Sequence, residues 1–266
     1  MSQRTPDMTL ASTFTRTSHA HPTPTTNSPP GLIILIIGAS HSISAVIVKA
    51  YVLAGASTLI LAARPSSATE LSSVSQRILS SCTKSSTPAP TIHLEQVDIS
   101  SSSSVSSLAQ RISSKLPNLD IVILNSGLTG PLVLHVDKGD PQDFSNVLDA
   151  IVKGTYHVAQ YFIPLLKANE GGKKMFIAVG LIAACITEGP FASTAYCLAK
   201  LAQARLVEFL AEQYKGEGVL AVAVHPGAVN TKMASVATPE SLRAFLSDDV
   251  ELCGAFCVWL SREKRM

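Results

Sequence analysis

The chain has 266 residues, and its 46% of apolar residues suffices for a sizeable buried core. Its 21 Lys and Arg residues nearly balance 19 Asp and Glu residues, which gives a formal net charge of +2. Because this charge is small and scattered, we expect neither a nucleic-acid nor an acidic-membrane partner. The longest apolar runs, such as LIILII at 32–37, are far shorter than the ~20 residues that span a bilayer.

The N-terminal stretch is rich in Ser, Thr and Pro and lacks the apolar segment of a signal peptide. We therefore interpret residues 1–30 as a disordered tail and residues 31–266 as one folded domain. The cysteines are odd in number and lack paired metal-ligand spacing, which predicts buried free thiols, no metal and a reducing, cytoplasmic location. Cys253 and Cys257 stand one helical turn apart and are expected to pack in the core.

From residue 31 onward, short apolar or β-branched runs alternate with longer segments of helical spacing or length. Strands are predicted at 32–37, 57–62, 91–97, 119–124, 174–179 and 219–224. Helices are predicted near 42–54, 67–81, 101–115, 142–167 and 195–215. This alternation predicts an α/β fold: a single doubly wound parallel-sheet (Rossmann) domain with helices on both faces.

The serine run SSSSVSS at 101–107 has the composition of a low-complexity tract. It precedes a segment of helical spacing, and the hydroxyl of Ser100 or Ser101 can accept a hydrogen bond from the first helical turn. We therefore predict a surface helix with a serine cap.

In a doubly wound sheet, ligands bind beyond the carboxyl ends of the strands. The first such place is IIGASHSISAVIVKAY at 36–51, where a dinucleotide loop needs glycines for a tight turn and close approach to a pyrophosphate. Gly38 is present, whereas Ser42 and Ser44 stand where further glycines would be expected. Taken alone, this loop is more often an ordinary strand-to-helix turn than a nucleotide site.

Arg64 follows the second strand with no acidic residue beside it. An acidic residue there would hydrogen-bond a free ribose hydroxyl, whereas an arginine accommodates a 2′-phosphate. This position favours NADP over NAD, although a solvated surface arginine explains the residue equally well by itself.

Polar or glycine-containing segments follow the later strands at the same edge. Asn125 and Gly127 suit a turn close to a cofactor, and the Pro-Gly bend after the sixth strand can present Val229 and Thr231 to an amide group. Each segment alone fits an ordinary turn, but their joint placement predicts one ligand site. The segments are Asp98, NSG at 125–127, VGLIAA at 179–184 and HPGAVNT at 225–231.

Tyr196 and Lys200 stand four positions apart in FASTAYCLAK at 191–200. With the other motifs in order, this pair resembles the short-chain dehydrogenase/reductase family, of a kind common among filamentous fungi. The resemblance covers about residues 31–262. It rests on Gly38 with Ile43, Asp98, NSG, Lys153 and Gly154 in IVKGT, Tyr196 with Lys200, and HPGAVNT. The Tyr-Lys pair alone is a weak motif, whereas the ordered set is specific.

The resemblance implies an NADP-dependent oxidoreductase that interconverts a carbonyl and an alcohol. Tyr196 would be the general acid/base, and Lys200 would favour the phenolate of a group with an ordinary pKa near ~10 and hold the nicotinamide ribose. The catalytic residues implied are Tyr196 and Lys200. The implied cofactor-binding set is Gly38, Ser42, Ile43, Arg64, Asp98, Asn125, Gly127, Lys153, Tyr196, Lys200, Val229 and Thr231.

The implied substrate is a small molecule. The family's substrate-side residues correspond to about 181–195 and the stretch after 231, which are mainly small and apolar here, so we expect an apolar substrate. Relatives often form dimers or tetramers through helices that correspond to 142–167 and 195–215, which makes a homo-oligomer a candidate.

The sequence also departs from the family pattern. Family members carry a serine after the fifth strand that orients the substrate carbonyl, and here Gly180 or Leu181 takes its place. The family asparagine that organises a relay water is Ile151. The segment FCVWLSREKRM ends where relatives continue into a last strand, so one sheet edge is expected to be unpaired.

Losing a preorganised donor typically costs ~10²–10³ in rate. The alternative to an enzyme is therefore a catalytically weak or inactive relative that acts as a binding or assembly module, or a degenerate gene product.

Overall fold

The computed structural model describes residues 31–85, 88–116, 118–180, 182–190, 192–238 and 240–262. The predicted tail at 1–30 and Leu181 lie outside the described residues. Among the described residues, no helix has both the length and the apolar character needed to cross a bilayer.

Six parallel strands form a single sheet in the order β3-β2-β1-β4-β5-β6. The strand order reverses between β1 and β4, which makes the carboxyl ends of these two strands the switch point of a doubly wound fold. The predicted fold class is confirmed, and the strand ends differ by only one or two residues from the predicted ranges. The strands are β1 Ile33–Ile37, β2 Thr58–Ala63, β3 Thr91–Gln96, β4 Ile121–Leu124, β5 Met175–Val179 and β6 Leu220–Val224.

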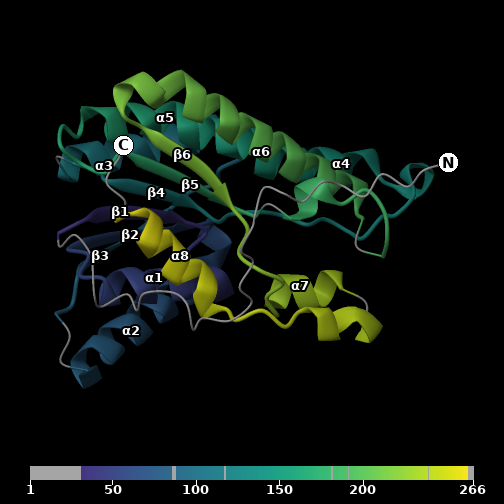
Figure 1. Cartoon of the computed structure of the whole chain (residues 1–266), viewed down its shortest axis with the longest axis horizontal. Coiled ribbons are helices and arrows are strands. Elements are labelled where there is room, and N and C mark those ends of the chain that lie inside the picture. Colours follow the sequence, from purple (N-terminus) through teal and green to yellow (C-terminus); the bar gives the residue numbers. More distant parts are fainter. Residues whose placement is uncertain are drawn as a thin grey trace.

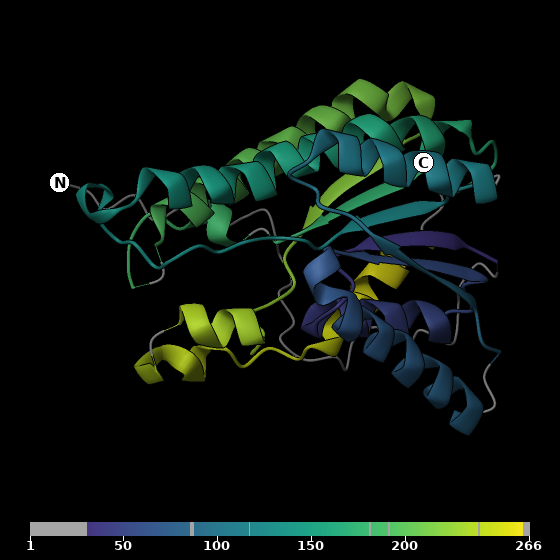
Figure 2. The ribbon, with the colours of Figure 1, turned by 180° about the vertical axis from the view of Figure 1, so that it is seen from behind.

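Helices cover both faces of the sheet, with α3, α5 and α6 on one side and α1, α2 and α8 on the other (Figure 1). Seen from behind, α5 and α6 run side by side (Figure 2). The helix predicted near 142–167 is divided by a π-helical segment, η5, Asp149–Lys153. The α-helices are α1 Ser42–Leu53, α2 Ala68–Ser85, α3 Ser102–Lys115, α4 Pro141–Leu148, α5 Gly154–Ala168, α6 Thr194–Tyr214, α7 Lys232–Ala237 and α8 Glu251–Leu260.

Short 3-10 segments complete the described secondary structure. They are η3 Pro65–Ser67, η4 Val136–Lys138, η6 Ile182–Cys185, η7 Lys215–Glu217 and η8 Glu240–Phe245.

The central strands are apolar on both faces because each face is buried under helices. In β1, Ile34 and Ile36 pack into the core on the α1 side, while Leu35 and Ile37 pack on the α5 side. All four side chains are fully buried. β3 lies at a sheet edge and exposes Leu94, so it lacks the continuous burial of a central strand. β6 forms the other edge of the sheet in the described part of the chain.

Helix α8 packs against α1 through a close approach of their backbones. A Cβ atom built on Gly254 would lie 2.9 Å from the carbonyl oxygen of Val46 on α1, so a larger residue would push the helices apart. The buried hydroxyl of Tyr51 donates to the Cys257 carbonyl oxygen at 2.9 Å and links the two helices. This contact holds the C-terminal helix against α1.

The cysteines divide into buried and exposed groups. Cys253 and Cys257 are buried between α8 and α1, which confirms the prediction that they pack in the core. Cys82 and Cys197 are also buried. Cys185 is exposed, so the expectation of a buried thiol was wrong at this position, because η6 lies on the surface at the end of β5.

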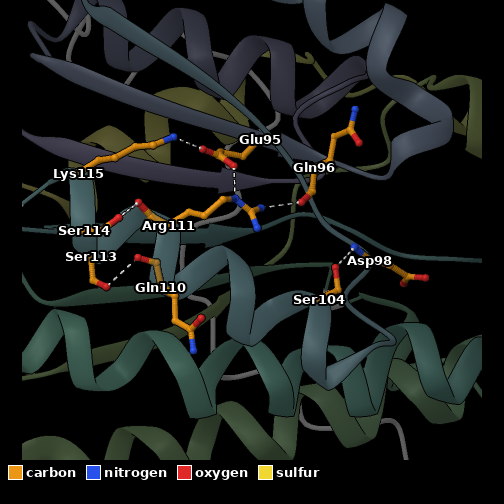
Figure 3. Close-up of polar contacts among 9 residues, drawn as sticks. All are labelled: Glu95, Gln96, Asp98, Ser104, Gln110, Arg111, Ser113, Ser114 and Lys115. Carbon is orange, nitrogen blue, oxygen red and sulfur yellow. Dashed lines mark hydrogen bonds and ion pairs between the residues drawn. The ribbon is translucent and has the colours of Figure 1, made fainter.

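Helix α3 is held to the edge strand β3 by ion pairs (Figure 3). Arg111 Nε and Lys115 Nζ lie 2.8 and 3.2 Å from the Glu95 carboxylate oxygens. Burial alone would raise the pKa of Glu95, but hydrogen bonds from Arg111 and Lys115 outweigh this effect and lower it. At the start of α3, Ser101 accepts from the Ser104 N–H, which confirms the predicted serine cap.

Candidate active site

The loop between β1 and α1 turns sharply at Gly38. Its φ angle is +88°, and a Cβ atom built there would lie 2.7 Å from the backbone nitrogen of Ser126. Only glycine fits, because the backbone is left-handed and the neighbouring space is filled. Ser42, in contrast, adopts a φ of +37° although it carries a side chain, so it occupies a position that favours glycine.

Ser44 replaces a second expected glycine and is fully buried. Its Oγ donates to the Gly38 carbonyl oxygen at 2.8 Å and accepts from Asn125 Nδ2 at 2.5 Å. The Asn125 N–H in turn donates to the Ile37 carbonyl oxygen at 2.9 Å. The substituted serine therefore joins the loops after β1 and β4 and brings Asn125 beside Gly38.

The first turn of α1 lacks a side-chain cap. His41 is the N-cap residue, and its ring nitrogen Nδ1 bonds the Ser40 hydroxyl at 2.7 Å rather than an α1 amide. The amides of Ser42 and Ile43 are therefore available to a partner outside the helix. A helix N-terminus with such amides suits a phosphate group, so this part of the structure fits a dinucleotide.

Arg64 and Asp98 lie at the same sheet edge, after β2 and β3. Arg64 is exposed at the start of η3. The Asp98 carboxylate accepts from the N–H and hydroxyl of Ser100 at 3.0 and 2.7 Å. The Asp98 N–H donates to Ser104 Oγ at 3.0 Å (Figure 3). These bonds hold Asp98 at the surface beyond β3.

The ammonium group of Lys200 is buried at the carboxyl end of β5. Its Nζ donates to the Val179 carbonyl oxygen at 3.1 Å and to Gln203 Oε1 at 2.8 Å. It lies 5.8 Å from the centre of the Tyr196 ring. The side chain is only 3% exposed, and this burial lowers the pKa of Lys200 to about 8.

Gln203 continues the contact from Lys200 toward α5. Its Nε2 donates to Thr155 Oγ1 at 2.7 Å, and the Thr155 hydroxyl donates to the Ile151 carbonyl oxygen at 2.6 Å. Both side chains are buried. This chain of hydrogen bonds is not predicted from the sequence, although a glutamine one turn after Lys200 on a mainly apolar helix is a signal of a buried polar contact.

Tyr196 lies one turn before Lys200 on α6, against an apolar cluster. Val147, Ile151 and Ala199 form the buried part of this cluster, and Tyr196 packs on it. Burial, with a smaller contribution from the charge of Cys197, raises the pKa of Tyr196 to about 12. The side chain is therefore a neutral phenol at pH 7.

The π-helical segment buries one of the residues considered in the sequence analysis and exposes another. Ile151, the position that the resemblance assigns to the relay asparagine, is fully buried in the cluster beside Tyr196. Lys153 is 63% exposed and pairs with Asp149 at 2.7 Å. Among the described contacts, none joins Lys153 to Tyr196 or Lys200. Gly154 follows, and a Cβ built there would lie 2.7 Å from Ile99 Cδ1, so α5 approaches the end of β3 closely.

Two glycines border the Lys200 ammonium. A Cβ built on Gly127 would lie 4.0 Å from Lys200 Nζ, and one on Gly180 would lie 2.6 Å from it. Gly180 also has a φ of +116°. A serine at Gly180, one of the two positions that could correspond to the family serine, would therefore displace Lys200. The other position, Leu181, is not among the described residues.

The loop after β6 is fixed by Asp248, which the sequence analysis did not identify. Its Oδ2 accepts from the Ala228 N–H at 2.6 Å. Gly227 has a φ of +94°, and a Cβ there would lie 2.9 Å from Asp248 Cβ. Within this loop Val229 is buried, and Thr231 caps α7 by accepting from Ala234 N at 3.0 Å.

Comparison with known proteins identifies a family model and fungal proteins that resemble this chain. A family model described as short chain dehydrogenase matches residues 32–241. Short chain dehydrogenase mpl6 of Monascus purpureus is 35% identical over 235 residues, covering 88% of this chain and 77% of that protein. Short chain dehydrogenase pgmD of Aspergillus terreus strain NIH 2624 is 30% identical over 259 residues, covering 95% of this chain and 83% of that protein.

Solved structures share the fold. A structure from Escherichia coli CFT073, complexed with NADPH, has a TM-score of 0.76 and 24% identity, covering 91% of this chain and 94% of that chain. At this identity the likeness concerns the fold. The family model and the fungal relatives show family membership: the chain belongs to the short-chain dehydrogenase family of oxidoreductases and is of the fungal type.

Proposed function

We propose that this chain is an NADP-dependent oxidoreductase that interconverts a carbonyl and an alcohol on a small, apolar substrate. The observation that carries the proposal is the pairing of Tyr196 and Lys200, 5.8 Å apart from ring centre to Nζ, at the carboxyl edge of the sheet. A proton donor and a buried cation at this edge are the groups that carbonyl reduction requires from the protein.

The residues that would hold NADP come from successive strand ends. The α1 amides at Ser42 and Ile43, next to Gly38, would bind the diphosphate, and exposed Arg64 would bind the 2′-phosphate. The solved relative complexed with NADPH supports this choice of cofactor. The remaining positions of the proposed cofactor site are Asp98, Asn125, Gly127, Lys153, Tyr196, Lys200, Val229 and Thr231. When bound, NADPH supplies hydride.

Tyr196 would supply the proton. In reduction, the carbonyl carbon gains a hydride and the carbonyl oxygen gains the Tyr196 phenolic proton, which solvent then replaces. Because burial raises the pKa of Tyr196 to about 12, the proton is present at neutral pH. Alcohol oxidation needs the phenolate, so we expect reduction to be the favoured direction at pH 7 and oxidation to rise with pH.

The substrate side of the site is apolar. The Thr194 N–H donates to the Val133 carbonyl oxygen, which places the segment at 131–136 beside the start of α6. Leu132 and Leu134 in this segment expose large apolar side chains. These side chains support an apolar substrate rather than a charged one.

A homo-oligomer is also part of the proposal. Leu198, Leu201 and Phe209 on α6 and Tyr156 on α5 expose large apolar side chains. Apolar side chains gathered on neighbouring helices suit a self-association surface. Light scattering or sedimentation of the purified chain tests this part.

A catalytically weak or inactive relative is the second candidate. It is favoured by the strained backbone of Ser42 and by the apolar Ile151 at the position of a relay asparagine. Such a protein would keep the fold and act by binding.

The deciding experiment measures NADPH and NADH oxidation by the purified full chain with a panel of ketones and quinones. Turnover that disappears in Tyr196→Phe but persists in the exposed-tyrosine control Tyr156→Phe supports the enzyme. NADPH binding without turnover of any compound favours the second candidate, and turnover retained in Tyr196→Phe contradicts the assigned proton donor.

A further inference from the structure

Gln203 is the side-chain partner of the buried Lys200 ammonium. The contact between Lys200 Nζ and Gln203 Oε1 is 2.8 Å, and Gln203 is 2% exposed. Lys200 also donates to the Val179 carbonyl oxygen. An ammonium group has three N–H donors, so these two bonds use two of them.

The orientation of the Gln203 amide follows from the groups beyond it. The Ile151 carbonyl can only accept, so the single hydroxyl proton of Thr155 is donated to it. The Thr155 oxygen must then accept from Gln203 Nε2, which turns Oε1 toward Lys200. The π-helical segment therefore fixes, through two buried side chains, which amide atom faces the lysine.

We propose that Gln203, oriented by Thr155, is the positioning residue that holds Lys200 beside Tyr196 in this chain. The inference rests on the proposed function for its catalytic meaning. Its structural basis does not depend on that function, because a buried cation needs hydrogen-bond acceptors. In the described contacts, Gln203 supplies the side-chain acceptor for Lys200. Ile151 contributes only its backbone carbonyl oxygen, which accepts from Thr155 at the other end of the hydrogen-bond chain.

The pKa of Lys200 depends on the groups that contact its ammonium, so its titration reports on the role of Gln203. β5 presents the Val179 carbonyl, α5 presents Thr155 through Gln203, and the ionisable side chain facing it is Tyr196 of its own helix. Removing the Gln203 oxygen would leave the charged form of Lys200 with one acceptor fewer. The neutral form would then be favoured, and the pKa of Lys200 would fall.

The test follows the Lys200 Cε resonance by NMR in full-length protein with labelled lysine, assigned by its absence in Lys200→Met. Wild type is expected to titrate near pH 8. We expect Gln203→Leu to titrate at least one pH unit lower and Gln203→Glu to titrate higher. Gln213→Leu is the matched control, since Gln213 is an exposed glutamine of the same helix, and it should match wild type.

A second pair of variants covers the case in which Gln203→Leu does not fold. Thr155→Val should shift the titration in the same direction as Gln203→Leu, whereas Thr155→Ser, which keeps the hydroxyl, should restore it. If folded Gln203→Leu or Thr155→Val titrates like wild type, the proposal is overturned.

Kinetics then separate this inference from the proposed function. In an active enzyme, Gln203→Leu should lower kcat about tenfold and shift its pH profile with the Lys200 titration, and KM for the carbonyl compound should change little. If wild type reduces no carbonyl compound, the proposed function fails, while the titrations still decide whether Gln203 holds Lys200. An unchanged kcat and pH profile in a folded, active Gln203→Leu would overturn the positioning role.

Discussion

The Lys200 ammonium donates to Gln203 Oε1 at 2.8 Å, three positions further along α6. The Lys200 Nζ lies beside the Tyr196 ring, 5.8 Å from its centre. The pKa of Tyr196 is raised chiefly by burial, and the placement of Lys200 depends on Val179 and Gln203, which lie outside the Tyr-Lys pair.

Arg64→Ala should weaken NADPH binding about 10- to 100-fold and leave NADH binding nearly unchanged. The reason is the loss of a charge-assisted hydrogen bond to the 2′-phosphate, which contributes roughly 1.5–3 kcal/mol. Calorimetric titration of both cofactors measures the effect. Arg77→Ala, an exposed arginine on α2, is the control. Equal losses for NADPH and NADH would show that Arg64 does not read the phosphate.

Ser42→Gly should relieve a left-handed backbone and tighten NADPH binding. The left-handed position costs a side-chain-bearing residue ~1–2 kcal/mol, and the greater freedom of unfolded glycine offsets ~0.5–1 kcal/mol of the gain. Lys174→Gly is matched to it, because Lys174 has a φ of +47° away from the loop. Denaturation should show a small gain in both variants, with tighter binding only in Ser42→Gly. Tighter NADPH binding in both variants would show that the change does not arise from the loop between β1 and α1.

Gly180→Ala should lower stability and activity by displacing Lys200. The added Cβ would meet Nζ at 2.6 Å, in addition to the strain of a φ of +116°. Gly189→Ala isolates the strain, because its φ is +92° and its Cβ would meet nothing within 4 Å. We expect both variants to lose roughly 1–2 kcal/mol of unfolding free energy from the backbone, with loss of activity only at Gly180. Full activity in folded Gly180→Ala would mean that Lys200 can move without consequence.

Ile151→Asn tests the missing relay asparagine. The change places an amide in a dry cluster, so the free energy of unfolding should fall by ~1–3 kcal/mol unless the amide finds partners. By the family resemblance it should raise carbonyl reduction, and the gain should vanish when Tyr196→Phe is added. Ile151→Val is the matched control for packing. A folded Ile151→Asn that binds NADPH without any gain would reject the missing asparagine as the limit on rate.

Arg111→Gln should reduce stability in a pH-dependent way. Because the pKa of Glu95 is lowered in the fold, its contribution is present above the ordinary carboxylate pKa and is lost as the pH falls through the folded pKa. We expect a loss of about 0.5–1 kcal/mol at pH 7 that shrinks under acid conditions. Urea denaturation at several pH values measures it. Arg205→Gln, in a more exposed pair with Glu208, should show little effect, and a pH-independent loss in Arg111→Gln would contradict the ion-pair explanation.

Much of the fold was readable from the sequence because it is encoded locally. Alternating apolar runs and helical segments sufficed to predict the fold class, because the central strands bury both faces and each helix buries one. The spacing of Tyr196 and Lys200 likewise placed both on one helix face, because residues four apart are neighbours there.

The remaining parts of the site depend on contacts between distant segments. Gln203 meets Thr155 across 48 positions of sequence, and Asp248 meets Ala228 across 20. Neither contact produces a repeating pattern of residues in the sequence from which it could be predicted. Whether Gly180 could carry a serine was likewise settled by the space that Lys200 occupies. Local pattern thus determined the elements and the spacing of Tyr196 and Lys200, whereas packing between α5, α6 and the end of β5 decided how Lys200 is held, because hydrogen-bond partners are fixed only once the chain is folded.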